Sequence, residues 1–285
     1  MHLLTEPFDY GFFLNALIAG ILVGALCGAL GVFVVLRRMS YIGQGLSQSV
    51  LGGVAPAVLA GIDPYLGAAA ATIVAGLLIN IIGRQHGVRP DAAIGIVSTT
   101  MFAAGVALVS ANRDRAVNLT DLLFGNILGV TDADIVLVGV VAAVVAVGGF
   151  VYFKVMAFTI VDSVAAAAHG VRAATVEFAF TIALAAVVVV SIRVVGVLLI
   201  AAVIVIPAST ARLVGRSLGL LIAVSTGLGV LAAAVGLFVS FHIEIASGPA
   251  IVLASSAAFA LTMVATTVTG VLTLRRARVR HSPPR

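Results

Sequence analysis

The sequence predicts an all-α membrane protein, a polytopic bundle of about nine transmembrane helices, and two observations lead to this fold class. The first is composition: 62% of the 285 residues are hydrophobic and 9% are charged, whereas soluble domains carry about 25% charged residues. The second is the form of the apolar segments, which are continuous runs close to the ~20 residues that cross a bilayer. The strands of a β-barrel would alternate instead. We therefore expect a multi-pass protein of the cell membrane, embedded in the lipid bilayer.

Nine apolar runs are candidate spans, and eight or ten spans are the alternatives. The count depends on whether the sixth and seventh runs are separate spans. The junction between them is interrupted only by Ser191, Arg193 and Gly196. Helix ends read from sequence are accurate to a few residues. The candidate spans are residues 11–36, 43–60, 66–83, 92–110, 132–153, 175–192, 194–211, 218–240 and 250–273.

The positions of the basic residues favour nine spans, because Lys and Arg accumulate in cytoplasmic loops. With the N-terminus outside and nine spans, only Arg113, Arg115 and Arg193 lie on the outer side. Fusing the sixth and seventh runs would move the five arginines of the C-terminal tail outside. We therefore expect an N-out and C-in topology. The inner basic residues are then Arg37, Arg38, Arg84, Arg89, Lys154, Arg172, Arg212, Arg216 and the five tail arginines.

The chain divides into a transmembrane domain at 1–273 and a basic cytoplasmic tail at 274–285. The tail is rich in Arg and Pro, so we expect it to be disordered and drawn to anionic lipid. The net charge of +5 arises from arginines at span ends and in this tail, and no nucleic-acid partner is expected. The first ten residues contain no Lys or Arg, which favours a retained first span over a cleaved signal.

Motifs for enzymatic chemistry are missing. The single lysine, Lys154, does not follow a glycine, so the chain has no phosphate-binding P-loop. There is no His-Glu-x-x-His motif, no Gly-x-Ser-x-Gly elbow and no pair of cysteines. Carboxylates and histidines within the spans are scarce, which disfavours a proton-coupled carrier. We expect a transport subunit that is not itself an enzyme and has no cofactor.

The most polar part of an otherwise apolar region is the stretch 37–53. Gln44, Ser47 and Gln48 are spaced i, i+3 and i+4, so in a helix they share one face. Such a face can line a solute pathway, or it can form hydrogen bonds between helices. At the outer end, His242 and Glu244 flank the loop HIEIASGP. This pair can meet a cation at the outer mouth, or it can form an interfacial hydrogen-bonding cluster.

Two further segments bear on assembly. The inner segment 154–174 contains an Ala-rich short helix, begun by Asp162 or Ser163 as N-cap and ended at Gly170. This helix is either a docking element on the cytoplasmic face or a surface loop. In the first span, glycines repeat every four residues, which lets helix backbones approach closely. We expect this stripe, made by Gly20, Gly24 and Gly28, to pack within the chain rather than form a dimer seam.

Five segments, in this order, resemble one known family, the membrane permeases of ABC importers for zinc, manganese and iron. Together they extend from about residue 30 to 265 and so cover most of the chain. The segments are VLRRMSYIGQGLSQSVLGGVA at 35–55, VRPDAAIGIVSTTMFAAGVALVS at 88–110, LLFGNILGVTDADI at 122–135, VVGVLLIAAVIVIPASTARLV at 194–214 and IEIASGPAIVL at 243–253.

The resemblance implies an assembly. Two copies of the permease would form a central pathway, two cytoplasmic ABC ATPase subunits would dock below, and an extracytoplasmic solute-binding protein would deliver the solute. The segment containing Asp162, Ser163, Ala168 and Gly170 resembles the family's ATPase-docking helix. ATP hydrolysis is expected on the separate ATPase subunit.

The sequence departs from the family at the polar stretch. The family usually carries Asp at the position of Gln44, His at the position of Gln48, and Pro at the position of Gly52, whereas Glu244 keeps an acid. A glutamine offers only a neutral carbonyl oxygen and is a poor zinc ligand. The metal-ligating residues therefore stay unassigned.

The resulting hypothesis is the permease subunit of an ATP-driven ABC importer, for a divalent metal such as zinc, manganese or iron. The residues expected in its substrate pathway are Gln44, Ser47, Gln48, His242 and Glu244. The alternatives are a permease of the same fold for a non-metal or chelated solute, a stand-alone secondary carrier, and a membrane scaffold that does not transport.

Overall fold

The structure is a computed structural model that describes residues 11–85, 87–112, 129–161, 169, 173–215, 217–243 and 245–280. This part of the chain is helical and contains no strand, which confirms the predicted all-α class. Its helices are α2 (Gly11–Leu36), α3 (Ile42–Ala60), α4 (Pro64–Gly83), α5 (Pro90–Ala111), α7 (Asp132–Val161), α9 (Ala173–Val195), α10 (Ile200–Val214), α11 (Leu218–Ile243) and α12 (Ser247–Arg280).

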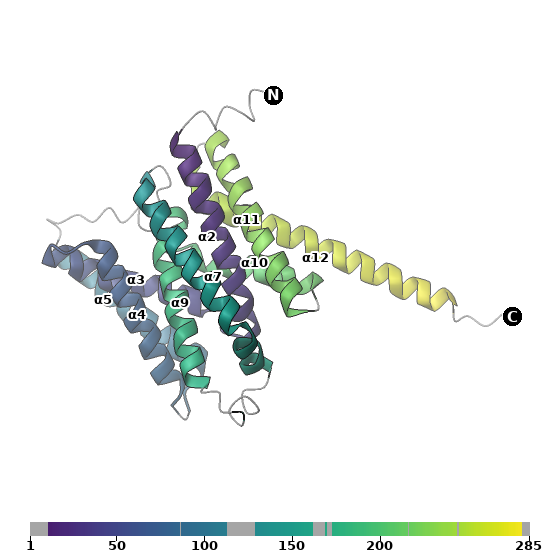
Figure 1. The fold of residues 1–285 in the computed structure, drawn as a ribbon, viewed down its shortest axis with the longest axis horizontal. Coiled ribbons are helices and arrows are strands. Elements are labelled where there is room, and N and C mark those ends of the chain that lie inside the picture. The colour runs from purple at the N-terminus through teal and green to yellow at the C-terminus, as the bar shows by residue number, and fades with distance from the viewer. Residues whose placement is uncertain are drawn as a thin grey trace.

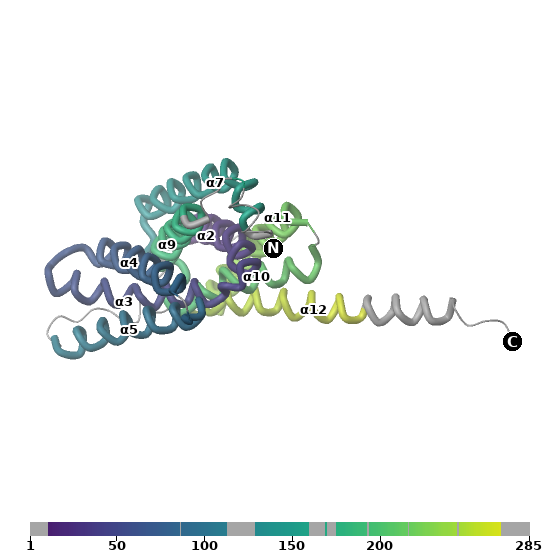
Figure 2. Tube along the Cα trace, turned by 90° about the horizontal axis from the view of Figure 1, so that it is seen from below, coloured from purple at the N-terminus to yellow at the C-terminus, as the bar shows by residue number. Residues whose placement is uncertain are grey.

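The helices form one bundle around α2 (Figures 1 and 2). Helix α2 contacts α11, α10, α7 and α9, and its buried face forms much of the core. On one side of the bundle, α3 lies between α4 and α5 and packs against both (Figure 2). The chain thus places the polar stretch of α3 in a layer of three helices, which also contacts α10 and α9.

Each of the nine predicted spans corresponds to one described helix, but the helices differ in length and polarity. Seven of them are long and apolar enough to cross a membrane: α2, α4, α5, α7, α9, α11 and α12. Helix α10 is apolar but shorter. Helix α3 is long enough but carries two glutamines and two serines in its first half. The polytopic helix bundle is confirmed, whereas the count of nine and the N-out orientation stay predictions.

The sixth and seventh candidate spans are separate helices. Helix α9 ends at Val195 and α10 begins at Ile200. Between them Gly196 has a φ of 83°, and its N–H donates to the Ile192 carbonyl over 2.8 Å. A left-handed residue after the last helical turn is a common way to end a helix, and glycine adopts it without strain. The break that the sequence leaves uncertain is therefore present at Gly196.

The glycine stripe of the first span packs within the chain, as predicted. A methyl group at Gly24 would meet the Gly229 carbonyl of α11, and one at Gly28 would meet the Ser225 carbonyl. The Ser225 hydroxyl donates to the Gly28 carbonyl over 2.6 Å, in the buried seam between the two helices. The small residues thus bring α2 and α11 close enough for a direct hydrogen bond from side chain to backbone.

Helix α12 projects from the bundle (Figures 1 and 2). Little of its apolar span is buried within the chain, and Leu253, Leu261 and Val264 are exposed. The helix continues past residue 273, the expected end of the transmembrane domain, to Arg280. The boundary between the predicted domain and tail therefore falls inside α12, and the division itself stays a prediction.

Candidate functional site

Glycines hold α3 in place between its neighbours. A methyl group at Gly45 would meet Ile94 of α5, and one at Gly53 would meet the Gly67 carbonyl of α4. A methyl group at Gly67 would in turn meet the Gly53 carbonyl, so α3 and α4 approach backbone to backbone. Close contact on two sides fixes the rotation of α3 about its axis, and it therefore fixes which residues the helix leaves uncovered.

The uncovered part of α3 carries the two glutamines. Gln44 is exposed and Gln48 is half-buried, whereas Ser47 is 1% exposed. The Ser47 hydroxyl donates to the Gln44 carbonyl over 3.0 Å, so its hydrogen-bonding capacity is used inside the helix. The structure therefore separates the predicted trio: the glutamines can reach a solute or a second subunit, and Ser47 lies against the chain's own core.

His242 lies at the end of α11 and is exposed. Its Nδ1 is 2.9 Å from the Phe238 carbonyl, and its ring lies 4.5 Å from the Phe238 ring, centroid to centroid. These contacts anchor the imidazole to its own helix. Glu244 is outside the described residues, so the predicted pair of His242 with Glu244 stays a prediction. The docking residues Asp162, Ser163, Ala168 and Gly170 also lie outside the described residues.

No ready-made set of charged metal ligands occurs in the described ranges. Nowhere among these residues do three or more His, Cys, Asp or Glu side chains gather in a metal-binding group. The face of α3 that carries Gln44 and Gln48 also offers no charged ligand, because the oxygen of a side-chain amide is neutral. Carbonyl oxygens suit hard cations such as manganese better than zinc, which prefers imidazole and thiolate. What the face can do chemically is replace part of the hydration shell of a passing cation.

Sequence reasoning missed the neighbours that frame the polar stretch. A methyl group at Gly43 would meet Ile204 of α10, and Gly45 lies next to Ile94 and Ser98 of α5. None of these neighbours carries a charge, and residues of α10 are far from α3 in the sequence. The glycines in the polar stretch could have predicted close helix contacts. They could not have predicted which helices make them.

A bundle of apolar helices that carries a polar face on one of its helices, here α3, is the fold expected of a membrane permease. Comparison with known proteins supports this class. The ABC 3 transport family matches residues 9–266. The chain belongs to this family, and it is a multi-pass protein of the plasma membrane.

Relatives of the chain cover nearly its full length. The manganese transport system membrane protein MntC of Halalkalibacterium halodurans is 32% identical over 274 residues, which are 95% of this chain and 94% of that protein. The manganese import system permease protein ScaB of Streptococcus gordonii is 36% identical over 252 residues, 88% of this chain and 90% of that protein. The expectation of a metal-type ABC transporter permease, drawn from the five segments, is confirmed at the level of the family.

The fold also agrees with a solved structure. PsaBC from Streptococcus pneumoniae, in complex with a Fab, has a chain that superposes with a TM-score of 0.81 at 33% identity. The match covers 91% of this chain and 95% of the PsaBC chain. The arrangement of helices described above is therefore shared along almost the whole length of both chains.

Proposed function

We propose that this chain is the permease subunit of an ATP-driven importer and that its solute is manganese or a related divalent metal ion. The observation that carries the proposal is the end-to-end similarity to permeases of manganese systems, at 32% and 36% identity. Because the matched region covers most of this chain and most of each relative, we infer that they share a mode of transport. The chain has no P-loop in its sequence, so ATP would be hydrolysed by a separate ABC ATPase subunit.

The pathway is proposed to run along the uncovered face of α3. Gln44 and Gln48 would offer their amide oxygens to a hydrated metal ion, in the way that carbonyl rings replace water in selective pores. Manganese accepts carbonyl and water oxygens readily, whereas zinc favours imidazole and thiolate. The two glutamines therefore support manganese more than zinc. His242 and Glu244 are proposed to stand at the outer entrance.

The proposed assembly contains two copies of this chain, two ATPase subunits and an extracytoplasmic solute-binding protein. The exposed apolar residues of α12 and the uncovered glutamines of α3 support a second copy, because a polar face next to lipid is costly. The segment from Asp162 to Gly170 is proposed to dock the ATPase. Motion of the ATPase subunits would then shift the helices from an outward-open to an inward-open arrangement.

The test is uptake of manganese into liposomes that contain the purified permease, the proposed ABC ATPase subunit and the binding protein. We expect ATP-dependent uptake of manganese, and no ATP hydrolysis by the permease alone. Uptake by the permease alone under an ion gradient would instead identify a secondary carrier. Assembly without any solute-stimulated hydrolysis would identify a scaffold.

The glutamines are tested in the same assay with Gln44→Asp and Gln48→His, singly and together. If the pathway follows α3, the double variant changes the preference between manganese and zinc, because carboxylate and imidazole suit zinc better than amides do. A matched control is Ser49→Ala, which removes a buried hydroxyl that bonds the Leu46 carbonyl within α3. Equal metal preference in all variants would show that the solute does not pass this face.

A chelated or non-metal solute is the second candidate, and the neutral chemistry of Gln44 and Gln48 favours it. Amides can donate as well as accept hydrogen bonds, so they can bind the polar rim of a chelate. In the uptake assay this candidate predicts that neither the wild type nor the double variant responds to simple manganese or zinc salts.

A further inference from the structure

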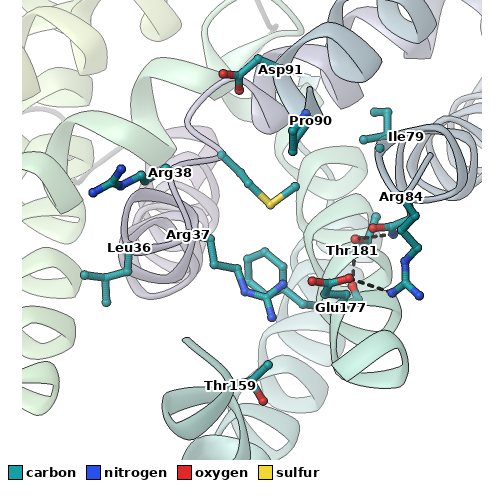
Figure 3. A pocket seen from close by; sticks show the side chains of 14 residues that line it. Leu36, Arg37, Arg38, Ile79, Arg84, Pro90, Asp91, Thr159, Glu177 and Thr181 are labelled. Atoms are coloured by element: carbon teal, nitrogen blue, oxygen red, sulfur yellow. Dashed lines mark hydrogen bonds and ion pairs between the residues drawn. The ribbon is translucent and has the colours of Figure 1, made fainter. Parts of the chain in front are cut away.

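A cavity of ≈ 530 Å³ lies at the end of the bundle where α2, α4 and α7 finish and α5 and α9 begin (Figure 3). It is separate from the glutamine face of α3. Three arginines and two acids occur among its lining residues, which gives the lining an excess of positive charge. The charged lining residues are Arg37, Arg38, Arg84, Asp91 and Glu177.

Most of these charges have a partner or face water. Arg84 donates to the Glu177 carboxylate over 2.7 Å, and this pair is about half exposed. Asp91 and Arg38 are exposed, and Figure 3 shows both apart from the ion pair. The excess of positive charge inside the cavity therefore belongs to Arg37.

Arg37 is half-buried and has no counter-ion in contact among the residues that the structure describes. Its guanidinium lies 5.3 Å from the centre of the Phe180 ring, and it has no ion pair or side-chain hydrogen bond with the described residues. Burial lowers the pKa of this arginine, and the charge of Glu177 opposes the effect. A buried cation without a hydrogen-bonding partner is costly, so this guanidinium can bind an anion that enters the cavity.

An apolar surface of α4 and α9 lies beside the cavity. It is formed by Ile73, Leu77, Phe178, Thr181 and Ile182, and Thr181 lines the cavity as well. Ile73, Phe178 and Ile182 are exposed on the outside of the bundle. A ligand with an anionic head in the cavity could therefore lay an apolar chain against this surface, next to the surrounding lipid.

We propose that the cavity binds the headgroup phosphate of an anionic phospholipid through Arg37 and Arg84, with an acyl chain against the exposed apolar surface of α4 and α9. Basic pockets between membrane helices are known to bind anionic headgroups. An arginine fork matches the geometry of phosphate oxygens. The exposed apolar surface favours this ligand over free phosphate, which would use the arginines alone, and over an acidic side chain of a partner subunit.

The test is native mass spectrometry of the full-length permease in detergent, titrated with phosphatidylglycerol, phosphatidylcholine or inorganic phosphate. We expect phosphatidylglycerol to bind about tenfold more tightly than phosphatidylcholine, because both lipids carry the phosphate but Arg37 would repel the choline ammonium of phosphatidylcholine. Arg37→Gln should remove this preference, whereas Arg212→Gln, an exposed arginine outside the cavity lining, should leave it intact. Phe178→Asn should weaken the binding of phosphatidylglycerol without changing how well inorganic phosphate competes for the arginines.

Three outcomes would overturn the proposal. The first is an unchanged preference in Arg37→Gln, or in Arg84→Gln if the first variant does not fold. The second is phosphate that competes fully at concentrations similar to those of the lipid, which would identify a phosphate site. The third is retained lipid binding in Arg37→Gln together with lost association with the ATPase subunit, which would identify a docking site for protein.

Discussion

At the scale of single residues, Ser225 illustrates how few polar contacts hold this bundle together. Its hydroxyl crosses from α11 to the Gly28 carbonyl of α2 over 2.6 Å, and the side chain is fully buried. Most other hydroxyls in the described spans bond carbonyls of their own helices, as Ser255 does to Ile251 over 2.9 Å. Only a bond between helices adds to the stability of the tertiary fold.

We predict that Ser225→Ala lowers the free energy of unfolding by about 1 kcal/mol, the usual contribution of a hydrogen bond between membrane helices. Ser255→Ala is the matched control, since it removes a buried hydroxyl without breaking a contact between helices. Equilibrium unfolding with sodium dodecyl sulfate in mixed micelles measures both. Equal losses in the two variants would show that the bond from Ser225 to Gly28 does not stabilise the seam.

At the scale of elements, the seam of α2 with α11 depends on glycines that face one another. Gly24 and Gly229 each lie against the carbonyl of the other. Backbone atoms cannot rotate away as side chains can, so an added methyl group must push the helices apart. The glycine repeat of the first span could be read from the sequence. Its partner on α11 could not, because about two hundred residues separate the two helices.

We predict that Gly24→Ala destabilises the permease by about 1–3 kcal/mol, the cost of overpacking a close contact. Gly227→Ala is the control on the same helix pair, because a methyl group there has nothing within 4 Å. It should be neutral or slightly stabilising, since alanine favours helix formation. The loss of folded protein on heating in detergent, followed by size-exclusion chromatography, compares the two. A Gly24→Ala protein as stable as Gly227→Ala would contradict the close packing.

At the scale of the whole molecule, the uneven coverage of the helices points to a larger assembly. Helix α2 is almost surrounded by the chain, whereas α12 projects from the bundle and buries little of its surface. Within the described part of the chain, Gln44 also stays exposed and Gln48 is only half-buried. Lipid can cover apolar side chains at no cost, but it cannot satisfy amides. A second copy of the chain over the α3 face would remove this conflict.

We predict that the purified permease contains two chains per particle. Native mass spectrometry, or light scattering corrected for bound detergent, should give twice the mass of the chain. The particle should still contain two permease chains when the ATPase subunit is absent, because the proposed contact is made by the permease itself. A particle with one chain, still active in ATP-dependent uptake after assembly with its partners, would overturn the proposed dimer.

The sequence by itself determined the fold class, the family and nearly all helix positions. Continuous apolar runs have no stable alternative to helices in a bilayer, since every backbone group must be satisfied within the segment. The two glutamines could also be recognised from the sequence, because polar side chains stand out within apolar runs. Even the doubtful break was encoded locally, in Gly196 and its left-handed backbone.

Only the tertiary structure decided which of these residues are accessible and which meet. It turned Ser47 into the core while Gln44 stayed exposed. It also brought Arg37, Arg84 and Glu177 to one cavity from three helix ends. Contacts of this kind depend on how helices rotate and pack, and small residues far apart in the chain determine that packing through direct backbone contact. The sequence pattern within one helix therefore cannot predict them.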